Sequence, residues 1–166
     1  MVRAPLLALL LLAACGGATP SGLTVTSGSF ADGAQIPKSF TCTGGSQVPD
    51  IAWSGDLHGA AALAVVVDYP DAPGGTFVHR VVVDLPPTTT HLAADLPAGA
   101  HQADNSAGRL GWTPPCPPSG THHYRFTVYG LSKPTGLPDG TAPEKAIEAI
   151  ASRSVVQGRL TGLVTH

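Results

Sequence analysis

Two short segments of the sequence contain residue types that could bind a charged group. Residues 69–79 read YPDAPGGTFVH, in which Asp71 stands between two prolines and His79 closes the segment. Residues 111–124 read GWTPPCPPSGTHHY and contain His122. Histidine can donate a hydrogen bond to an anion, and its charge changes near neutral pH. If both histidines begin strands at the same end of a sheet, they could face one pocket; the alternative is two turn histidines on unrelated edges.

The prolines in these segments predict stiff loops. Proline fixes φ and lacks an amide N–H, and four prolines surround Cys116. This composition predicts a rigid rim that holds a pocket open without a cost of ordering. Gly111 and Gly120 would allow the backbone to approach closely at either end of the rim.

The sequence lacks the motifs of several other kinds of site. It has no G-x-S-x-G, no P-loop, no dinucleotide fingerprint and no H-E-x-x-H, and its cysteines lack zinc-finger spacing. His58, His91, His101 and His166 lie in polar, loop-like contexts, where we expect them to be solvated. We therefore expect neither a metal nor a cofactor. A hydrolase using His79, His122 and Asp71 would need an activated water, because no activated Ser or Cys nucleophile is evident.

Composition indicates one β-rich domain. The chain has 166 residues, 43% hydrophobic and only 12% charged, so it can bury a core. Its 20 Gly and 16 Pro favour a fold with many turns. The net charge of −2 argues against a nucleic-acid partner, which would require a basic surface.

Five runs have the character of strands, and one segment has that of a helix. A period-two alternation in 123–131 predicts a strand with one buried face. Continuous apolar runs in 62–68 and 77–85 predict central strands covered on both faces. The other strand-like runs are 23–30 and 154–164. Thr141 and Glu144 have capping-box spacing, which predicts a helix with an apolar stripe of Ala146, Ile147, Ile150 and Ala151 that covers a sheet.

The N-terminus has the pattern of an export signal. One positive charge precedes a short apolar run, and Leu12-Ala13-Ala14-Cys15 resembles the bacterial lipobox, where cleavage leaves a lipidated cysteine. The alternative is an ordinary signal with a chance cysteine. We expect a signal peptide at 1–14, lipidated Cys15 with a flexible tether at 15–22, and one domain at 23–166. The protein would be anchored to the membrane by lipid at Cys15, on the extracytoplasmic face.

Two cysteines then remain in the domain, Cys42 and Cys116. Export favours disulfides, but spacing alone does not establish proximity. A disulfide and two free buried thiols are equally open on the sequence.

Four segments resemble the phosphatidylethanolamine-binding protein family, in particular its bacterial branch, often described as similar to the Raf kinase inhibitor protein. The signature segments are DxPDAPGGTFVH and GxxxPCPPSGTHxY, and they are accompanied by FTCTGGSQVPDIAWSG and VVVDLPPTTTHL. The resemblance covers about Leu23 to Val164. It implies a mainly β protein, a sandwich of two antiparallel sheets with one or a few peripheral helices.

The resemblance also implies a small pocket for anions and phosphoryl head groups at one end of the sandwich. Asp71 would orient donors there, either His79 or a backbone amide, rather than touch the ligand. Protonation of His79 and His122 below about pH 6.5 would strengthen binding. The matching positions in this sequence are Pro70, Asp71, Ala72, Pro73, His79, Gly111, Pro115, Pro117, His122 and Tyr124. Tyr69 and Phe77 occupy two further pocket positions, where the sequence departs from the family pattern.

The clearest departure from the family pattern is Tyr69, where aspartate is usual. Tyrosine would remove a negative charge and supply a hydroxyl donor beside the pocket, unless it only caps the strand end. Asp68 is no substitute, because neighbouring residues on a strand point to opposite faces. Phe77 also stands where tryptophan is usual, so one aromatic wall is kept and an indole donor is lost.

Three functions are considered on this basis. The first is a non-enzymatic binding protein for a small anion or a phosphorylated head group. The second is an inhibitor of a protease or another cell-envelope enzyme, because family members inhibit kinases or proteases through the same end of the sandwich. The third, and the least favoured, is a hydrolase that uses the pocket histidines.

Overall fold

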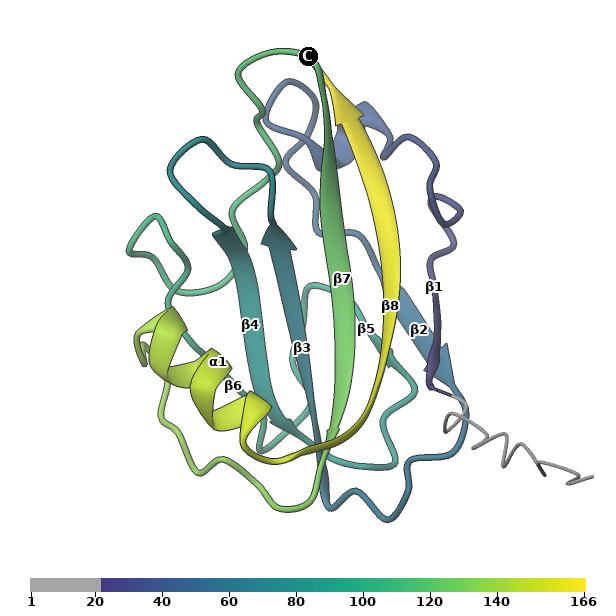
Figure 1. The fold of residues 1–166 in the computed structure, drawn as a ribbon, viewed down its shortest axis with the longest axis vertical. Coiled ribbons are helices and arrows are strands. Elements are labelled where there is room, and N and C mark those ends of the chain that lie inside the picture. The colour runs from purple at the N-terminus through teal and green to yellow at the C-terminus, as the bar shows by residue number, and fades with distance from the viewer. Residues whose placement is uncertain (1–21) are drawn as a thin grey trace, which may run out of the picture.

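The computed structural model describes residues 22–166, which form two antiparallel sheets packed face to face with one helix outside (Figure 1). The expected signal peptide and Cys15 lie outside the described residues. No helix within residues 22–166 has the length and apolar character needed to cross a membrane. The small sheet has the order β1 (Thr24–Thr26), β2 (Ile51–Ser54), β5 (His91–Leu92). The large sheet has the order β6 (His101–Gln102), β4 (Phe77–Leu85), β3 (Ala62–Tyr69), β7 (Thr121–Leu131), β8 (Ser154–Thr165).

The central strand β3 is buried on both faces, as its continuous apolar run predicts. Leu63, Val65 and Val67 belong to the main core, which also contains Trp53 of the small sheet. The alternate residues of β3, 62, 64 and 66, belong to a second core, which contains two residues of the helix. Side chains alternate between the two faces of a strand, so each apolar set of β3 meets a different layer.

The helix α1 (Pro143–Ala151) covers the outer face of the large sheet beside β4 (Figure 1). Ala146 and Ile150 are buried as predicted, whereas Ala151 is exposed. The predicted capping box is wrong: Ala142 is the N-cap, and no side chain caps the helix. The Thr141 hydroxyl instead donates to the Pro138 carbonyl at 2.7 Å, in the turn before the helix. The helix begins one residue later than predicted, so Thr141 lies outside it and its hydroxyl makes a local hydrogen bond of the kind that threonine makes in turns.

The chain before β2 lies along the free edge of β8. The Gly33 amide donates to the Thr161 carbonyl at 2.7 Å, and the Ile36 amide donates to the Leu163 carbonyl at 2.7 Å. The 3-10 turn η1 (Lys38–Phe40) follows directly. This path carries residues 37–47 to the end of the sandwich where β3 ends and β7 begins (Figure 1).

Candidate functional site

A cavity of about 520 Å³ opens where β3 ends and β4 and β7 begin. Its walls come from β-strand ends, the turn 72–76 and the proline-rich segment. Of the pocket residues that the resemblance implies, six line this cavity: Tyr69, Ala72, Pro73, Phe77, His79 and Tyr124.

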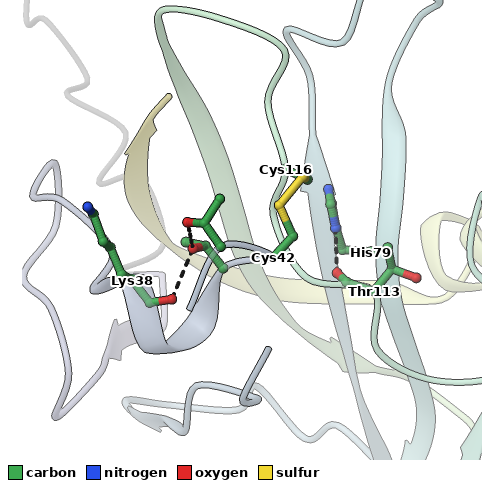
Figure 2. Close-up of a disulfide and its surroundings, with 7 residues drawn as sticks. Lys38, Cys42, His79, Thr113 and Cys116 are labelled. Carbon is green, nitrogen blue, oxygen red and sulfur yellow. Dashed lines mark hydrogen bonds between the residues drawn. A yellow bond between two sulfur atoms is a disulfide. The ribbon is translucent and has the colours of Figure 1, made fainter. Parts of the chain in front are cut away.

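His79 lies at the cavity as a neutral hydrogen-bond acceptor. Its Nδ1 lies 2.6 Å from the Thr113 carbonyl (Figure 2), and a carbonyl can only accept, so Nδ1 carries the proton. Nε2 is then left with a lone pair, and it is buried without a partner among the described residues. Burial disfavours the charged imidazolium and lowers the pKa of His79 to about 4. The expectation that His79 protonates just below pH 6.5 is therefore wrong for the free cavity.

Tyr124 provides the complementary hydroxyl donor. Its side chain is buried, and its Oη has no hydrogen-bond partner in residues 22–166. Burial raises the pKa of Tyr124, so the hydroxyl keeps its proton. The ring stacks on Tyr69, with 5.0 Å between ring centroids, and meets His79 edge-on at 5.3 Å. An unpaired buried hydroxyl costs free energy unless a ligand or water satisfies it.

The Tyr69 ring lines the cavity, but its hydroxyl is directed to His122. The Tyr69 hydroxyl lies 2.9 Å from His122 Nδ1, while His122 Nε2 contacts the Ser119 carbonyl. Because that carbonyl can only accept, Nε2 carries the proton and the Tyr69 hydroxyl donates to Nδ1. His122 therefore lies behind Tyr69 and is not among the residues that line the cavity. Tyr69 is a wall of the cavity, and its hydroxyl is already engaged.

Asp71 holds a backbone amide, one of the two donors expected for it, but the histidine that it orients is His123 and not His79. Its Oδ2 accepts hydrogen bonds from the His123 amide at 3.0 Å and from His123 Nδ1 at 2.7 Å. The amide bond, followed by the ring bond, lowers the pKa of the Asp71 carboxyl. The carboxylate thereby joins the turn after β3 to the start of β7. No role was predicted for His123 from the sequence. Because it stands between His122 and Tyr124, it lies on the opposite face of the strand from these two residues.

The Asp71–His123 contact predicts a measurable titration shift. His123→Ala removes the ring hydrogen bond and keeps the amide hydrogen bond, so the pKa of the Asp71 carboxyl should rise only part of the way to its ordinary value. A ¹³C NMR pH titration of the carboxyl measures the midpoint. His91→Ala, on β5 of the other sheet, is the control and should leave the midpoint unchanged. An unchanged midpoint in His123→Ala would show that the ring does not hold the carboxylate.

The remaining selected residues lie outside the cavity lining. Pro115 and Pro117 line a second cavity, of about 540 Å³, on the other side of the proline-rich segment. Gly111 is buried with φ +87°, and its carbonyl accepts from Asn105 Nδ2 at 3.0 Å. Pro70 is half-buried in the turn after β3. Asp68 points away from the site and forms two hydrogen bonds with Arg125, at 2.7 and 2.6 Å.

Several functional contacts had no signal in the sequence. The buried Asn105 also donates to Thr113 Oγ1 at 2.8 Å, so it fixes the segment that orients His79. Ser106 lines the cavity, and its hydroxyl accepts from the Val78 amide at 2.8 Å. These residues lie on a loop with no periodic pattern, so only the folded chain brings them to the site.

The cysteines left open by the sequence are joined in the structure. Cys42 and Cys116 form a disulfide with 5.4 Å between their Cα atoms. Figure 2 shows the bond beside His79 and Thr113. Cys116 lines the first cavity and Cys42 lines the second.

The site has little positive charge of its own. Among residues 22–166, no Lys or Arg lines the first cavity. The buried Arg80 donates to the carbonyls of Ala93 and Ala94 at 2.7 and 3.0 Å, and Arg125 is paired with Asp68. His79 is therefore the one lining group within the described chain that could become a cation at acidic pH.

Comparisons with known proteins agree with the architecture. A family model described as phosphatidylethanolamine-binding protein matches residues 26–165. A Mycobacterium tuberculosis protein named "Putative lipoprotein LppC" is 48% identical over 143 residues, which cover 84% of this chain and 71% of that protein. A Methanothermobacter thermautotrophicus protein is 37% identical over 141 residues, which cover 81% of this chain and 93% of that protein. The crystal structure of Escherichia coli YbcL, described as a new member of the mammalian PEBP family, has a TM-score of 0.83 at 29% identity and covers 88% of this chain and 99% of its own.

Proposed function

The chain belongs to the phosphatidylethanolamine-binding protein family, and on this premise we propose that its first cavity binds a phosphoryl group in its singly protonated form. The observation that carries the proposal is the pair of buried, unpartnered polar atoms at the cavity, His79 Nε2 and Tyr124 Oη. One is an acceptor and the other a donor, so the ligand must supply both an O–H and an oxygen acceptor.

A phosphate monoester monoanion has both of these groups. Its P–O–H donates to His79 Nε2, and one of its unprotonated oxygens accepts from the Tyr124 hydroxyl. A dianion beside a protonated His79 contains the same number of protons as this bound state. The two descriptions differ only in where the proton lies along the hydrogen bond between the phosphoryl oxygen and Nε2. The ring of Phe77 and the prolines supply apolar walls, which exclude water and strengthen both bonds.

A matched pair of probes tests this chemistry. Methyl phosphate and dimethyl phosphate are both monoanions at pH 5, but only methyl phosphate carries a P–O–H. Calorimetry on the full chain should show methyl phosphate binding at least about tenfold more tightly at pH 5, the value of one or two hydrogen bonds. Its affinity should fall about tenfold by pH 7, because the second pKa of a phosphate monoester is about 6.

The variants separate the two contacts. His79→Ala should abolish the preference for methyl phosphate, because alanine has no acceptor for the P–O–H, and Tyr124→Phe should weaken both probes by about two- to tenfold. Equal affinity for the two probes at pH 5 in the parent protein would contradict the proposal. A binding role is favoured over hydrolysis because His79 is oriented by a carbonyl and lies beside no activated nucleophile in the described cavity lining.

We also propose that the protein is a lipoprotein anchored on the extracytoplasmic face of the membrane. The Leu-Ala-Ala-Cys sequence before the domain and the lipoprotein name of the Mycobacterium tuberculosis relative support this location. Cys15→Ser should move the protein from the membrane fraction to the soluble fraction, because the modified cysteine would be lost. Alkaline carbonate extraction followed by immunoblotting measures the distribution, with Cys42→Ser as the control. Membrane retention of Cys15→Ser would contradict the anchor.

A further inference from the structure

Residues 114–118, here called the partition, separate the two cavities. Pro114, Cys116 and Pro118 line the first cavity, whereas Pro115 and Pro117 line the second. The partition therefore presents alternate residues to alternate sides, as an extended chain does. A displacement of this segment would change both cavities at once.

The partition is held by few bonds. Four of its five residues are prolines, so only Cys116 has a backbone N–H to donate. Within residues 22–166, two bonds join the partition to other segments, one hydrogen bond and one disulfide. Cys42 makes both of them. The Cys42 amide donates to the Pro115 carbonyl at 3.0 Å, and the Cys42 sulfur is bonded to Cys116.

The segments on either side of the partition are held independently. Thr113 is bonded to β4 through its amide, which donates to the His79 carbonyl at 3.0 Å. At the other end, the Ser119 carbonyl accepts from the His122 ring. Loss of the disulfide would thus leave the ends of the proline-rich segment in place and its middle tied by a single hydrogen bond, from the Cys42 amide to the Pro115 carbonyl.

The loop that carries Cys42 is, by contrast, stable in its own right. The Ser46 amide donates to the Thr41 carbonyl, and the Gln47 amide donates to the Ser39 carbonyl. The buried Thr41 hydroxyl donates to the Lys38 carbonyl at 2.9 Å. Residues 37–47 therefore form an anchor that keeps its shape without the disulfide.

Both bonded cysteines are exposed, although they lie at the wall of a buried site. Access of a thiolate to a disulfide sulfur is a condition for thiol–disulfide exchange, and accessible disulfides are the labile ones. We propose that Cys42–Cys116 is a thiol–disulfide exchange site in the folded protein, and that its redox state sets the position of the partition. Its effect on phosphoryl binding rests on the function proposed above.

The reaction partner is a dithiol, as a small molecule or on a protein. One of its thiolates attacks a sulfur of the Cys42–Cys116 bond, forms a mixed disulfide and releases the other cysteine as a thiolate. The second thiolate of the dithiol then attacks its own mixed-disulfide sulfur and releases the second protein thiolate. The dithiol is oxidised to a disulfide, two electrons pass to the protein, and both cysteine thiolates take up protons from solvent.

Exchange in the folded state is tested with the full chain carrying Cys15→Ser, so that only Cys42 and Cys116 react. Dithiothreitol is added without denaturant, and the free thiols are alkylated and counted by mass spectrometry. The rate should lie within about tenfold of the rate in urea. A bond that opens only on global unfolding would react at least roughly a thousandfold more slowly, and that result would overturn the proposal.

Release of the partition is tested by amide hydrogen exchange, which needs no ligand. The Cys42 amide donates to Pro115, so its exchange should accelerate at least about tenfold after reduction. The Thr113 amide is the internal control and should keep its protection. Unchanged protection of the Cys42 amide, or loss of far-UV circular dichroism on reduction, would overturn the partition role.

Binding of methyl phosphate to the oxidised and reduced forms separates the two proposals. A change in affinity of about fivefold or more supports the exchange site as a control on binding. If neither form binds while alkylation and the Cys42 amide behave as expected, the proposed function fails and the exchange site stands. Equal binding by both forms would show that the partition does not control the cavity and would overturn the role assigned to it.

Discussion

Acidification from pH 7 to pH 4 should lower the free energy of unfolding by about 3 kcal/mol through His79 alone. The pKa of His79 is about 4 in the folded protein, against about 6.5 in an unfolded chain. The unfolded chain therefore binds a proton that the folded protein excludes at every pH between these values. The stability contribution is complete above pH 6.5 and is lost as the pH falls to 4, at about 1.4 kcal/mol per pH unit.

Urea unfolding of the parent and of His79→Gln at pH 7, 5.5 and 4 measures this contribution. Glutamine keeps an amide that can hydrogen-bond to the Thr113 carbonyl and has no proton to gain in this range. The difference in unfolding free energy between the two proteins should change by about 1.4 kcal/mol between pH 7 and 5.5, and by about 3 kcal/mol by pH 4. The measurement is made without phosphate, because a bound anion would favour the protonated ring. A difference that stays constant with pH would contradict the assigned state of His79.

The same acid dependence connects stability to binding. A ligand that supplies a proton to Nε2 satisfies the imidazole without requiring a free, buried cation. The cost of protonating His79 in the empty cavity is thus the reason why a protonated phosphoryl group fits the site better than an unprotonated anion. The lining residues within the described chain include no fixed cation that could replace this proton.

The long elements of the fold could be predicted from the sequence, because the pattern of apolar residues in each strand depends on whether one or both of its faces are covered. The continuous apolar run of β3 and the alternation in β7 each extend over enough residues to distinguish one covered face from two. The strands β5 and β6 have two residues each, too few for any period to be visible. The capping box failed because the helix begins one residue later than predicted, with Ala142 as its N-cap, so Thr141 lies in the preceding turn and bonds to a carbonyl there.

The site was predictable in composition but not in its connections. Alternation placed Asp68 on the face opposite Tyr69, and the structure pairs it there with Arg125. Alternation could not show that the Tyr69 hydroxyl is bonded to His122, because that contact joins two strands through ring orientation. The same limit applies to His79, whose acceptor character depends on the Thr113 carbonyl, a backbone group with no sequence signal.

Removal of the disulfide should lower the free energy of unfolding by about 4 kcal/mol. The two cysteines are 74 residues apart, and in the chain-entropy account a cross-link over a loop of this length restricts the unfolded chain by roughly that amount. The double variant Cys42→Ala, Cys116→Ala should therefore have a melting temperature about 10 °C below that of the parent. Both proteins carry Cys15→Ser, so that no third thiol contributes.

The matched control is reduction. A dithiol should destabilise the parent to the level of the double variant and leave the double variant unchanged, because each treatment removes the same cross-link. A loss of less than about 1 kcal/mol in the double variant would show that the unfolded chain is not restricted by the bond as the entropy model requires. This stabilisation acts on the unfolded state, whereas protection of the Cys42 amide reports the folded partition. The two measurements can therefore differ, and a large loss of stability with a protected Cys42 amide would identify the bond as a simple cross-link.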